Sequence, residues 1–209
     1  MIIKFDHISY SCSDMKHTQD IISSYYLKFE ESNLENIPCK KALLKQKNPL
    51  HNIYMYYAKG DDIPIEITQY TNIKGRNETM KISSRKIEWS VKNLEKAEQF
   101  LLCLGANKCK GEAYTYSLMA VLEKEPLMIY LKKDENAVAP GYLDVEGWSS
   151  IGLIVDNVQN EAEKFKRNGF FVTESSPIMV NSKKLNIVFV RGFNGEIIEL
   201  ISLEKGEKR

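Results

Sequence analysis

The sequence predicts an α+β protein built from three consecutive βαβββ modules with mixed sheets. A strand-like segment that ends near Asp or Asn and leads into a helix-like segment occurs three times, at residues 4–12, 85–91 and 149–155. Each copy then continues through strand-like runs separated by turn residues. A unit that recurs in the same order indicates a repeat architecture. We place the modules at residues 1–72, 80–133 and 147–204, with a linker at 134–146.

In the first module, apolar and other core-type residues recur at intervals of three and four, which predicts an amphipathic helix over residues 15–29. Ser13 or Asp14 can cap this helix. Residues 51–59 and 63–70 have strand character and flank a Gly-Asp-Asp turn, so a hairpin is expected. The positions that define the helix stripe are Met15, Thr18, Ile22, Tyr25 and Phe29.

The other two modules carry clearer helix signals. Asn93 precedes an apolar stripe that ends at Gly105, which predicts a helix over residues 93–104. Asn157 precedes a similar stripe that ends at residues 168–169. Strands are expected at 116–122 and 127–132 in the second module, and at 185–190 and 196–203 around the tight turn Asn194-Gly195 in the third.

Composition excludes several classes of function. The chain has 29 basic and 28 acidic side chains, so no overall field favours nucleic acid or an anionic membrane. No apolar run is long enough to cross a bilayer, and no secretion signal is recognisable at the start, so a cytoplasmic location is expected. The four cysteines lack CxxC spacing and are expected to be reduced thiols; they are Cys12, Cys39, Cys103 and Cys109.

Three segments resemble the vicinal oxygen chelate superfamily, which includes glyoxalase I, methylmalonyl-CoA epimerase, extradiol dioxygenases and the fosfomycin- and bleomycin-resistance proteins. They are FDHISYSCSDM at residues 5–15, GWSSIGLIVDNV at 147–158 and RGFNGEIIELI at 191–201. The resemblance covers nearly the whole chain. It implies that two modules pair around a cup-shaped cavity, with helices on the outer face and a divalent metal ion inside.

The same resemblance implies a set of metal ligands. It assigns His7 on the first strand, Glu66 on the last strand of the first module and Glu199 on the last strand of the third. Ser150 stands where a second His is frequent. In the second module Lys86 replaces the His, and Met128 or Ile129 replaces the Glu, so that module retains no ligand. One imidazole and two carboxylates suit Mn, Ni, Co, Zn or Fe and leave positions open for substrate. No organic cofactor is predicted.

Strand alternation supports the two carboxylates independently. Glu66 shares a face with Thr68 and Tyr70, opposite two isoleucines, and therefore lies on a polar face. Glu199 has apolar neighbours on both faces of its strand. Since an unpaired buried carboxylate is costly, Glu199 needs a partner such as a metal, Arg or Lys. A simpler interpretation of His7 is a hydrogen-bonded, half-buried side chain without a metal.

The predicted function is a metal-dependent lyase or isomerase that acts on a small oxygenated substrate through a metal-stabilised enolate, with Glu66 or Glu199 as the base. An alternative is a binding protein without turnover, like the bleomycin-resistance members, because Ser150 and Lys86 occupy ligand positions. A third is an extradiol-type dioxygenase, which needs two His where only His7 is available. No glutathione or CoA site is recognisable.

The odd number of modules bears on how the chain assembles. Three modules cannot all pair within one chain, so a homodimer is expected, and the sequence leaves open which modules pair. His17 and His51 are expected at the surface. A group of aromatic residues can line a substrate cavity or pack across strands: Tyr54, Tyr56, Tyr57, Tyr70, Trp89 and Tyr116.

Overall fold

The computed structural model describes residues 1–18, 22, 25–58, 60, 62–71, 73, 85–137, 141–180 and 182–204. The first third of the chain forms β1 (Ile2–Cys12), a 3-10 turn η1 (Met15–Thr18), β2 (Tyr25–Leu34), α1 (Pro38–Lys41), β3 (His51–Ala58) and β4 (Ile65–Tyr70). The middle forms β5 (Lys86–Val91), α2 (Leu94–Leu104), β6 (Asn107–Lys108), β7 (Thr115–Leu118) and β8 (Leu127–Lys133). The last part forms β9 (Gly147–Val155), α3 (Val158–Arg167), β10 (Phe171–Val172), β11 (Ser176–Val180), β12 (Lys183–Arg191) and β13 (Ile197–Leu203).

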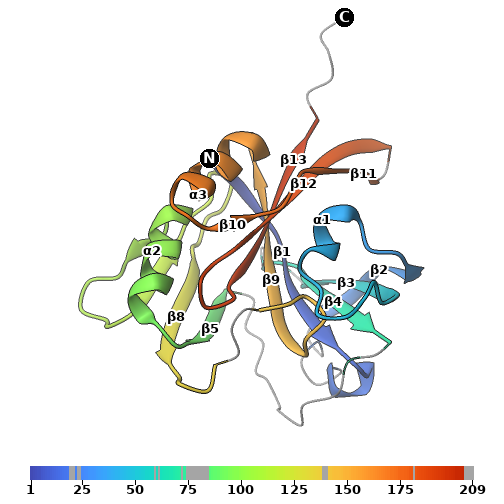
Figure 1. The fold of residues 1–209 in the computed structure, drawn as a ribbon, viewed down its shortest axis with the longest axis horizontal. Coiled ribbons are helices and arrows are strands. Elements are labelled where there is room, and N and C mark those ends of the chain that lie inside the picture. Colours follow the sequence, from blue (N-terminus) through green and yellow to red (C-terminus); the bar gives the residue numbers. More distant parts are fainter. Residues whose placement is uncertain are drawn as a thin grey trace, which may run out of the picture.

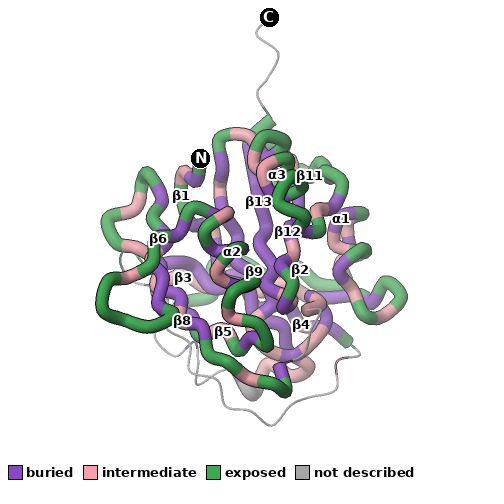
Figure 2. The backbone as a smooth tube through the Cα atoms, turned by 60° about the vertical axis from the view of Figure 1, so that its left-hand side comes forward, coloured by how far each residue is buried: buried purple, intermediate pink, exposed green. Residues whose placement is uncertain are grey.

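The first and third modules share one nine-stranded mixed sheet. Its order is β10-β12-β13-β9-β1-β4-β3-β2, and β11 also pairs with β12. The two modules meet where β1 and β9 pair antiparallel, while β4 runs parallel to β1 and β13 runs parallel to β9. The central strands are buried along most of their length (Figure 2). The α+β class with mixed sheets is therefore confirmed, and the pairing that the sequence left open is between modules one and three.

The second module forms a separate four-stranded sheet, β5-β8-β7-β6, that packs on the outer face of the large sheet. Its helix α2 lies beside α3 (Figure 1), and the rings of Phe100 and Phe165 are 5.5 Å apart. Leu118 and Ala120, which an unpaired module would expose, are 0% and 3% exposed. Met119, Val121 and Leu122, by contrast, are 49%, 59% and 69% exposed. One face of this segment is therefore covered within the chain and the other is not, and the homodimer stays a prediction.

The helices behind β5 and β9 form where the sequence places them. The side chain of Asn93 accepts a hydrogen bond from the Lys96 amide, and that of Asn157 accepts one from the Asn160 amide. Both are N-caps that satisfy an otherwise free helix amide. Gly105 ends α2 with a φ of 99°, a left-handed conformation that glycine adopts without a Cβ penalty. The hairpin β3–β4 and the hairpin β12–β13 also form as expected.

The predicted helix over residues 15–29 is wrong. Within its described part, residues 15–18 form the short turn η1. Residues 25–29 belong to β2, which pairs antiparallel with β3. The run Tyr-Tyr-Leu-Lys-Phe is rich in residues that favour strands, and β3 offers it an open edge of amides and carbonyls. The predicted strand 116–122 is also too long, because β7 ends at Leu118 and the amides of Val121 and Leu122 donate to Ile2 and Ile3 of β1.

One helix lies on the inner face of the large sheet, whereas all helices were expected outside. Figure 1 shows α1 on the opposite side of β1 and β9 from α2 and α3. Cys39 and Leu43 form a second apolar cluster there with Leu143, and the Leu143 amide donates to the Leu43 carbonyl at 2.9 Å. Asp144 accepts hydrogen bonds from the amides of Lys45 and Gln46. The segments around residues 36–46 and 141–146 therefore fill much of the inner face.

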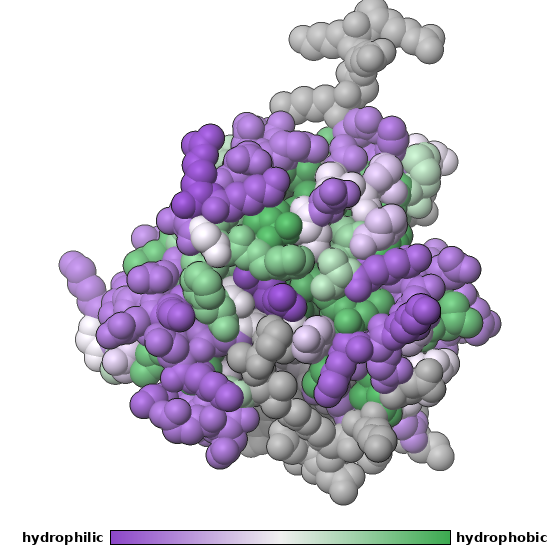
Figure 3. All heavy atoms as spheres, in the orientation of Figure 1, coloured by the Kyte–Doolittle hydropathy of each residue, from purple (hydrophilic) through white to green (hydrophobic). Residues whose placement is uncertain are grey.

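On the face that Figure 3 shows, hydrophilic side chains predominate toward the edges and apolar side chains gather near the middle. Among the described residues, no helix combines the length and apolar character that crossing a membrane requires.

Candidate functional site

Three predicted ligands converge on the inner face of the large sheet. His7 lies on β1, Glu66 on β4 and Glu199 on β13. His7 Nε2 is 3.5 Å from Glu199 Oε2 and 3.9 Å from Glu66 Oε2. Strand register produces this meeting, because Glu66 stands opposite Ser9 of β1, while His7 and Glu199 both stand opposite Gly152 of β9. All three residues belong to one chain.

His7 is held rigidly from two sides. Its Nδ1 hydrogen bonds with Asp6 Oδ2 at 2.9 Å, which fixes the ring and aims Nε2 at the two carboxylates. A Cβ on Gly152 would lie 2.4 Å from His7 Cε1, so only glycine leaves room for the ring. Burial alone would lower the pKa of His7, but Glu66, Asp6 and Glu199 raise it well above 6.5. The three neighbouring carboxylates thus favour the charged form of the imidazole.

Glu66 is a firmly ionised carboxylate. Ser9 Oγ donates a hydrogen bond to its Oε1 at 3.0 Å, and Thr68 Oγ1 donates another at 3.1 Å. Burial opposes ionisation, yet His7, Lys40 and these two hydrogen bonds bring the pKa of Glu66 down to about 2. Glu66 and Thr68 share the inner face, as strand alternation indicated.

Glu199 lies in an apolar setting, as its sequence neighbours predicted. It is 5% exposed, between Ile197 and Ile201 on its own strand and opposite Phe189 of β12. A cation is one of the partners expected for this buried carboxylate. The structure supplies His7, whose Nε2 lies 3.5 Å from Glu199 Oε2.

Sequence reasoning missed Lys40 and misplaced His51. Lys40 of α1 is half-buried, and the charges of Glu66 and Glu199 outweigh burial and raise the pKa of its ammonium group. No periodic pattern in residues 35–50 indicated this position. His51 was expected at the surface but is 2% exposed, with its ring 5.3 Å from that of Tyr70. Along β3, His51 shares a face with Ile53 and Met55, which pair with Thr68 and Glu66 of β4. This period-two pattern was the available sequence signal for the burial of His51.

Ser150 and Lys86, which stand at the other ligand positions that the resemblance implies, place no charged group at the site. Ser150, opposite Ser9, is 7% exposed and lies on the same inner face as the site. Lys86 pairs with Met128 in the sheet of the second module and is exposed, so that module supplies no ligand position. Tyr54 and Tyr56 pack against the main hydrophobic core, as the cross-strand interpretation expects for these two, whereas the Tyr70 ring lies 5.3 Å from that of His51 on the inner face.

The chemistry of these donors fits a divalent ion. Within the described residues, His7 Nε2 is buried without a hydrogen-bond partner, which is the state of a nitrogen free to bind a metal once deprotonated. Ligand atoms about 2.0 to 2.3 Å from a shared ion lie roughly 3 to 4 Å apart, close to the separations from Nε2 to the carboxylates. In the described ranges no group of three or more His, Cys, Asp or Glu is already arranged to hold an ion. Binding would therefore require these side chains to reorient.

Comparison with known proteins gives structural similarity only. No protein-family model matches the chain, and no curated protein does. A methylmalonyl-CoA epimerase from Mycobacterium tuberculosis is 10% identical with a TM-score of 0.43, over 98% of this chain and 91% of that one. A fosfomycin resistance protein from Listeria monocytogenes is 18% identical with a TM-score of 0.42, over 62% and 97%. An integron cassette protein from V. cholerae is 19% identical with a TM-score of 0.40, over 59% and 97%. Similarity of this degree carries no information about the activity of this chain.

The topology agrees with the resemblance seen in the sequence. Two modules join at their first strands, and one His and two Glu from their first and last strands face each other on the inner side of one sheet. The resemblance to the vicinal oxygen chelate superfamily implies such a pairing of two modules, and here a third module is added on the outer face.

Proposed function

We propose that this chain is a metal-dependent lyase or isomerase of the glyoxalase-like type that acts on a small oxygenated substrate. The observation that carries the proposal is the convergence of His7, Glu66 and Glu199, with the His7 Nε2 lacking a hydrogen-bond partner among the described residues. A divalent ion at these donors would supply Lewis-acid stabilisation of the negative charge that develops when a proton leaves the carbon beside a carbonyl group.

The two carboxylates are suited to different tasks. Glu66 accepts two hydroxyl hydrogen bonds and has a pKa of about 2, so it is a weak base and a permanent negative ligand. Glu199 lies among Ile197, Ile201 and Phe189, and in the described part of the chain no hydroxyl group donates a hydrogen bond to its carboxylate, so it is less restrained than Glu66. We therefore assign the proton transfer to Glu199 Oε2 and the orientation of the site to Glu66 and His7.

Metal titration of protein purified without a His tag tests this proposal. Mn, Ni, Co and Zn should each be tried, and at least one should bind with one ion per chain. Glu199→Gln keeps the size of the side chain and removes its charge, so we expect it to lower the affinity at least about tenfold. Glu196→Gln is the matched control, since Glu196 is equally buried, at 6% exposed, but hydrogen bonds within the β12–β13 turn. Equal affinities for the two variants would contradict the assignment.

A binding protein without turnover is the second candidate. It is favoured by the filled inner face, where Leu43 and Leu143 are 0% and 4% exposed, and by Ser150 in place of a fourth ligand. Absence of metal binding, together with saturable binding of a small organic molecule, would support it. His51 does not provide the second histidine that a dioxygenase site needs. It pairs with Tyr70, which lies four positions along β4 from Glu66.

A further inference from the structure

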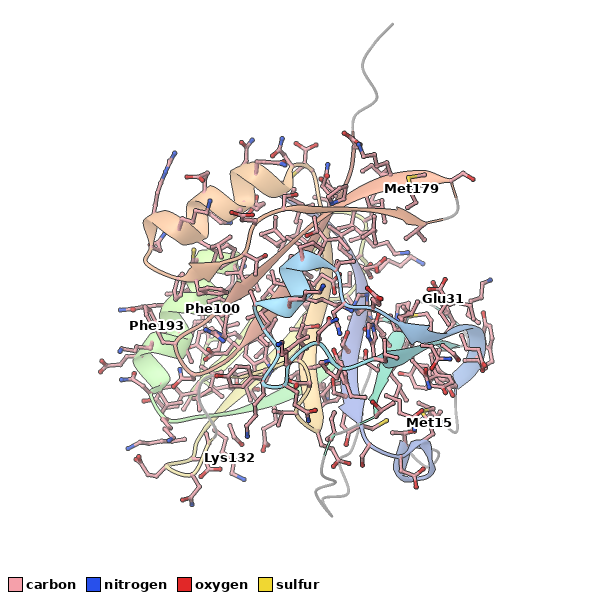
Figure 4. All side chains as sticks on the ribbon, turned by 45° about the vertical axis from the view of Figure 1, so that its right-hand side comes forward. Met15, Glu31, Phe100, Lys132, Met179 and Phe193 are labelled. Carbon is pink, nitrogen blue, oxygen red and sulfur yellow. The ribbon has the colours of Figure 1, made fainter. Side chains whose placement is uncertain are left out.

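Residues 36–46, which we call the lid, lie over the inner face of the large sheet. They include α1, which crosses in front of β1 and β9 in Figure 4. Hydrogen bonds join the lid to residues 141–146. The Leu143 amide donates to the Leu43 carbonyl at 2.9 Å, and the Asp144 carboxylate accepts from two consecutive lid amides at 2.6 and 2.8 Å. The lid is thus attached to a segment that is distant in the sequence.

The lid packs on the immediate neighbours of Glu199. Ile197 and Ile201 flank Glu199 on β13. Phe189 stands opposite Glu199 on β12. These three apolar residues belong to the same buried cluster as Leu43 of the lid. Residues that alternate along a strand, or that stand opposite each other on neighbouring strands, share a face of the sheet. The lid therefore covers the part of the inner face that carries Glu199.

The segment that holds the lid also approaches the strand beside Glu66. Ser11 Oγ donates a hydrogen bond to the Leu143 carbonyl. Ser11 shares a face of β1 with Ser9, which donates to Glu66. The three candidate ligands are at most 7% exposed. Because a substrate must touch these residues to react at the site, so little exposure requires that part of the structure above them moves.

Few contacts hold the lid against the sheet. Its buried residues are Asn36, Cys39 and Leu43. Helix α1 has only four residues and no side chain caps its N-terminus, and so short a helix has little stability of its own. The Cys39 amide donates to Ser176 Oγ of β11 at 3.0 Å. Cys39 and Leu43 belong to a small apolar cluster that is distinct from the main core. These are the features of a segment that opens at a lower cost than the whole fold.

We propose that the lid opens locally while the large sheet stays folded, and that this opening admits the substrate to the site. Opening breaks the hydrogen bonds of the lid with Leu143 and Asp144, and Asp144 is the latch because its carboxylate holds two lid amides. The admission of substrate rests on the proposed function, whereas the local opening does not.

The local opening is tested by labelling two buried thiols in the wild-type protein. Cys39 of the lid is 2% exposed, and Cys12 of β1, in the main core, is 0% exposed. The protein reacts with N-ethylmaleimide in EDTA-containing buffer at urea concentrations below the unfolding transition, and mass spectrometry of peptides gives the rate at each thiol relative to the unfolded chain. Cys39 should react at least about tenfold faster than Cys12 and depend less on urea, because a local opening exposes less surface. Equal relative rates with equal urea dependence would overturn the proposal.

The latch is tested by Asp144→Asn, which removes the charge and leaves one acceptor oxygen for two amides. It should raise the Cys39 labelling rate at least about fivefold and leave that of Cys12 within about twofold. Asp134→Asn is the matched control, since the Asp134 carboxylate accepts one amide hydrogen bond, at 2.8 Å, outside the lid. Equal acceleration of both thiols by Asp144→Asn would contradict a latch. If Asp144→Asn does not fold, Ser176→Ala takes its place, because it removes the acceptor of the Cys39 amide.

Admission to the site is tested with Mn²⁺ as the probe, by stopped-flow measurement of tryptophan fluorescence. Asp144→Asn should raise the association rate constant by the factor by which it raises the Cys39 labelling rate, within about twofold, because both rates are proportional to the open population. Asp134→Asn should leave it unchanged. An association rate constant that does not respond to Asp144→Asn would overturn the admission through the lid, even if Cys39 labelling shows that the lid opens. If neither the wild type nor any variant binds a divalent ion, the proposed function and the admission fall, and the labelling experiment alone still decides whether the lid opens locally.

Discussion

His51 should make the folded protein lose stability in mild acid. Burial, and then the charge of Lys40, lowers the pKa of His51 from 6.5 to about 4. Below pH 6.5 the unfolded chain therefore takes up a proton that the folded chain does not, and stability falls with falling pH. Each pH unit in this window is worth about 1.36 kcal/mol, so the loss between pH 6.5 and pH 5 should be about 2 kcal/mol.

Urea unfolding in EDTA-containing buffer, followed by tryptophan fluorescence at several pH values from 5 to 6.5, measures this loss. His51→Gln cannot titrate, so its stability should lack that part of the slope. His7→Gln is the control, because the raised pKa of His7 leaves it protonated in both states below pH 6.5. The stability that His7 contributes is complete below that pH and is lost as pH rises through its folded pKa. Equal slopes from pH 5 to 6.5 in wild type and His51→Gln would refute the reasoning.

Three further predictions concern packing, capping and assembly. Gly152→Ala should lower the free energy of unfolding by about 1 to 3 kcal/mol in urea denaturation, because the added Cβ would lie 2.4 Å from His7 Cε1; a loss no greater than that of Ser150→Ala would contradict the close approach. Asn93→Ala should cost about 1 kcal/mol, since it removes the cap on the Lys96 amide, and an unchanged unfolding midpoint would show that the cap is dispensable. Light scattering at micromolar concentration should give twice the chain mass of 24.1 kDa if the predicted homodimer forms, and a mass of one chain would end that prediction.

Local signals in the sequence were sufficient for most elements. Asn93 and Gly105 bound α2 because side-chain capping and a left-handed C-terminal residue act within a few positions. The Asn194-Gly195 turn formed for the same reason, with Gly195 at a φ of 96°. Strand alternation placed Glu66 on the inner face, since the side-chain period of a strand is independent of its neighbours.

The wrong or missed predictions share one cause. In each case the contacts that determine the structure join segments that are distant in the sequence. Tyr25 and Phe29 fit a helix stripe and a strand equally well, and the open edge of β3 decided in favour of β2. Lys40 carries no local mark of burial, because α1 reaches the inner face only through its packing against β12 and residues 141–146. The burial of His51 follows from the pairing of β3 with β4, which its alternation with Ile53 and Met55 alone did not fix. The sequence by itself thus determined most of the central strands, two helices, and the placement of His7, Glu66 and Glu199 on their strands. Only the tertiary structure decided that β1 pairs with β9 in one chain and that α1 lies on the inner face, since both depend on long-range register and packing rather than on local preference.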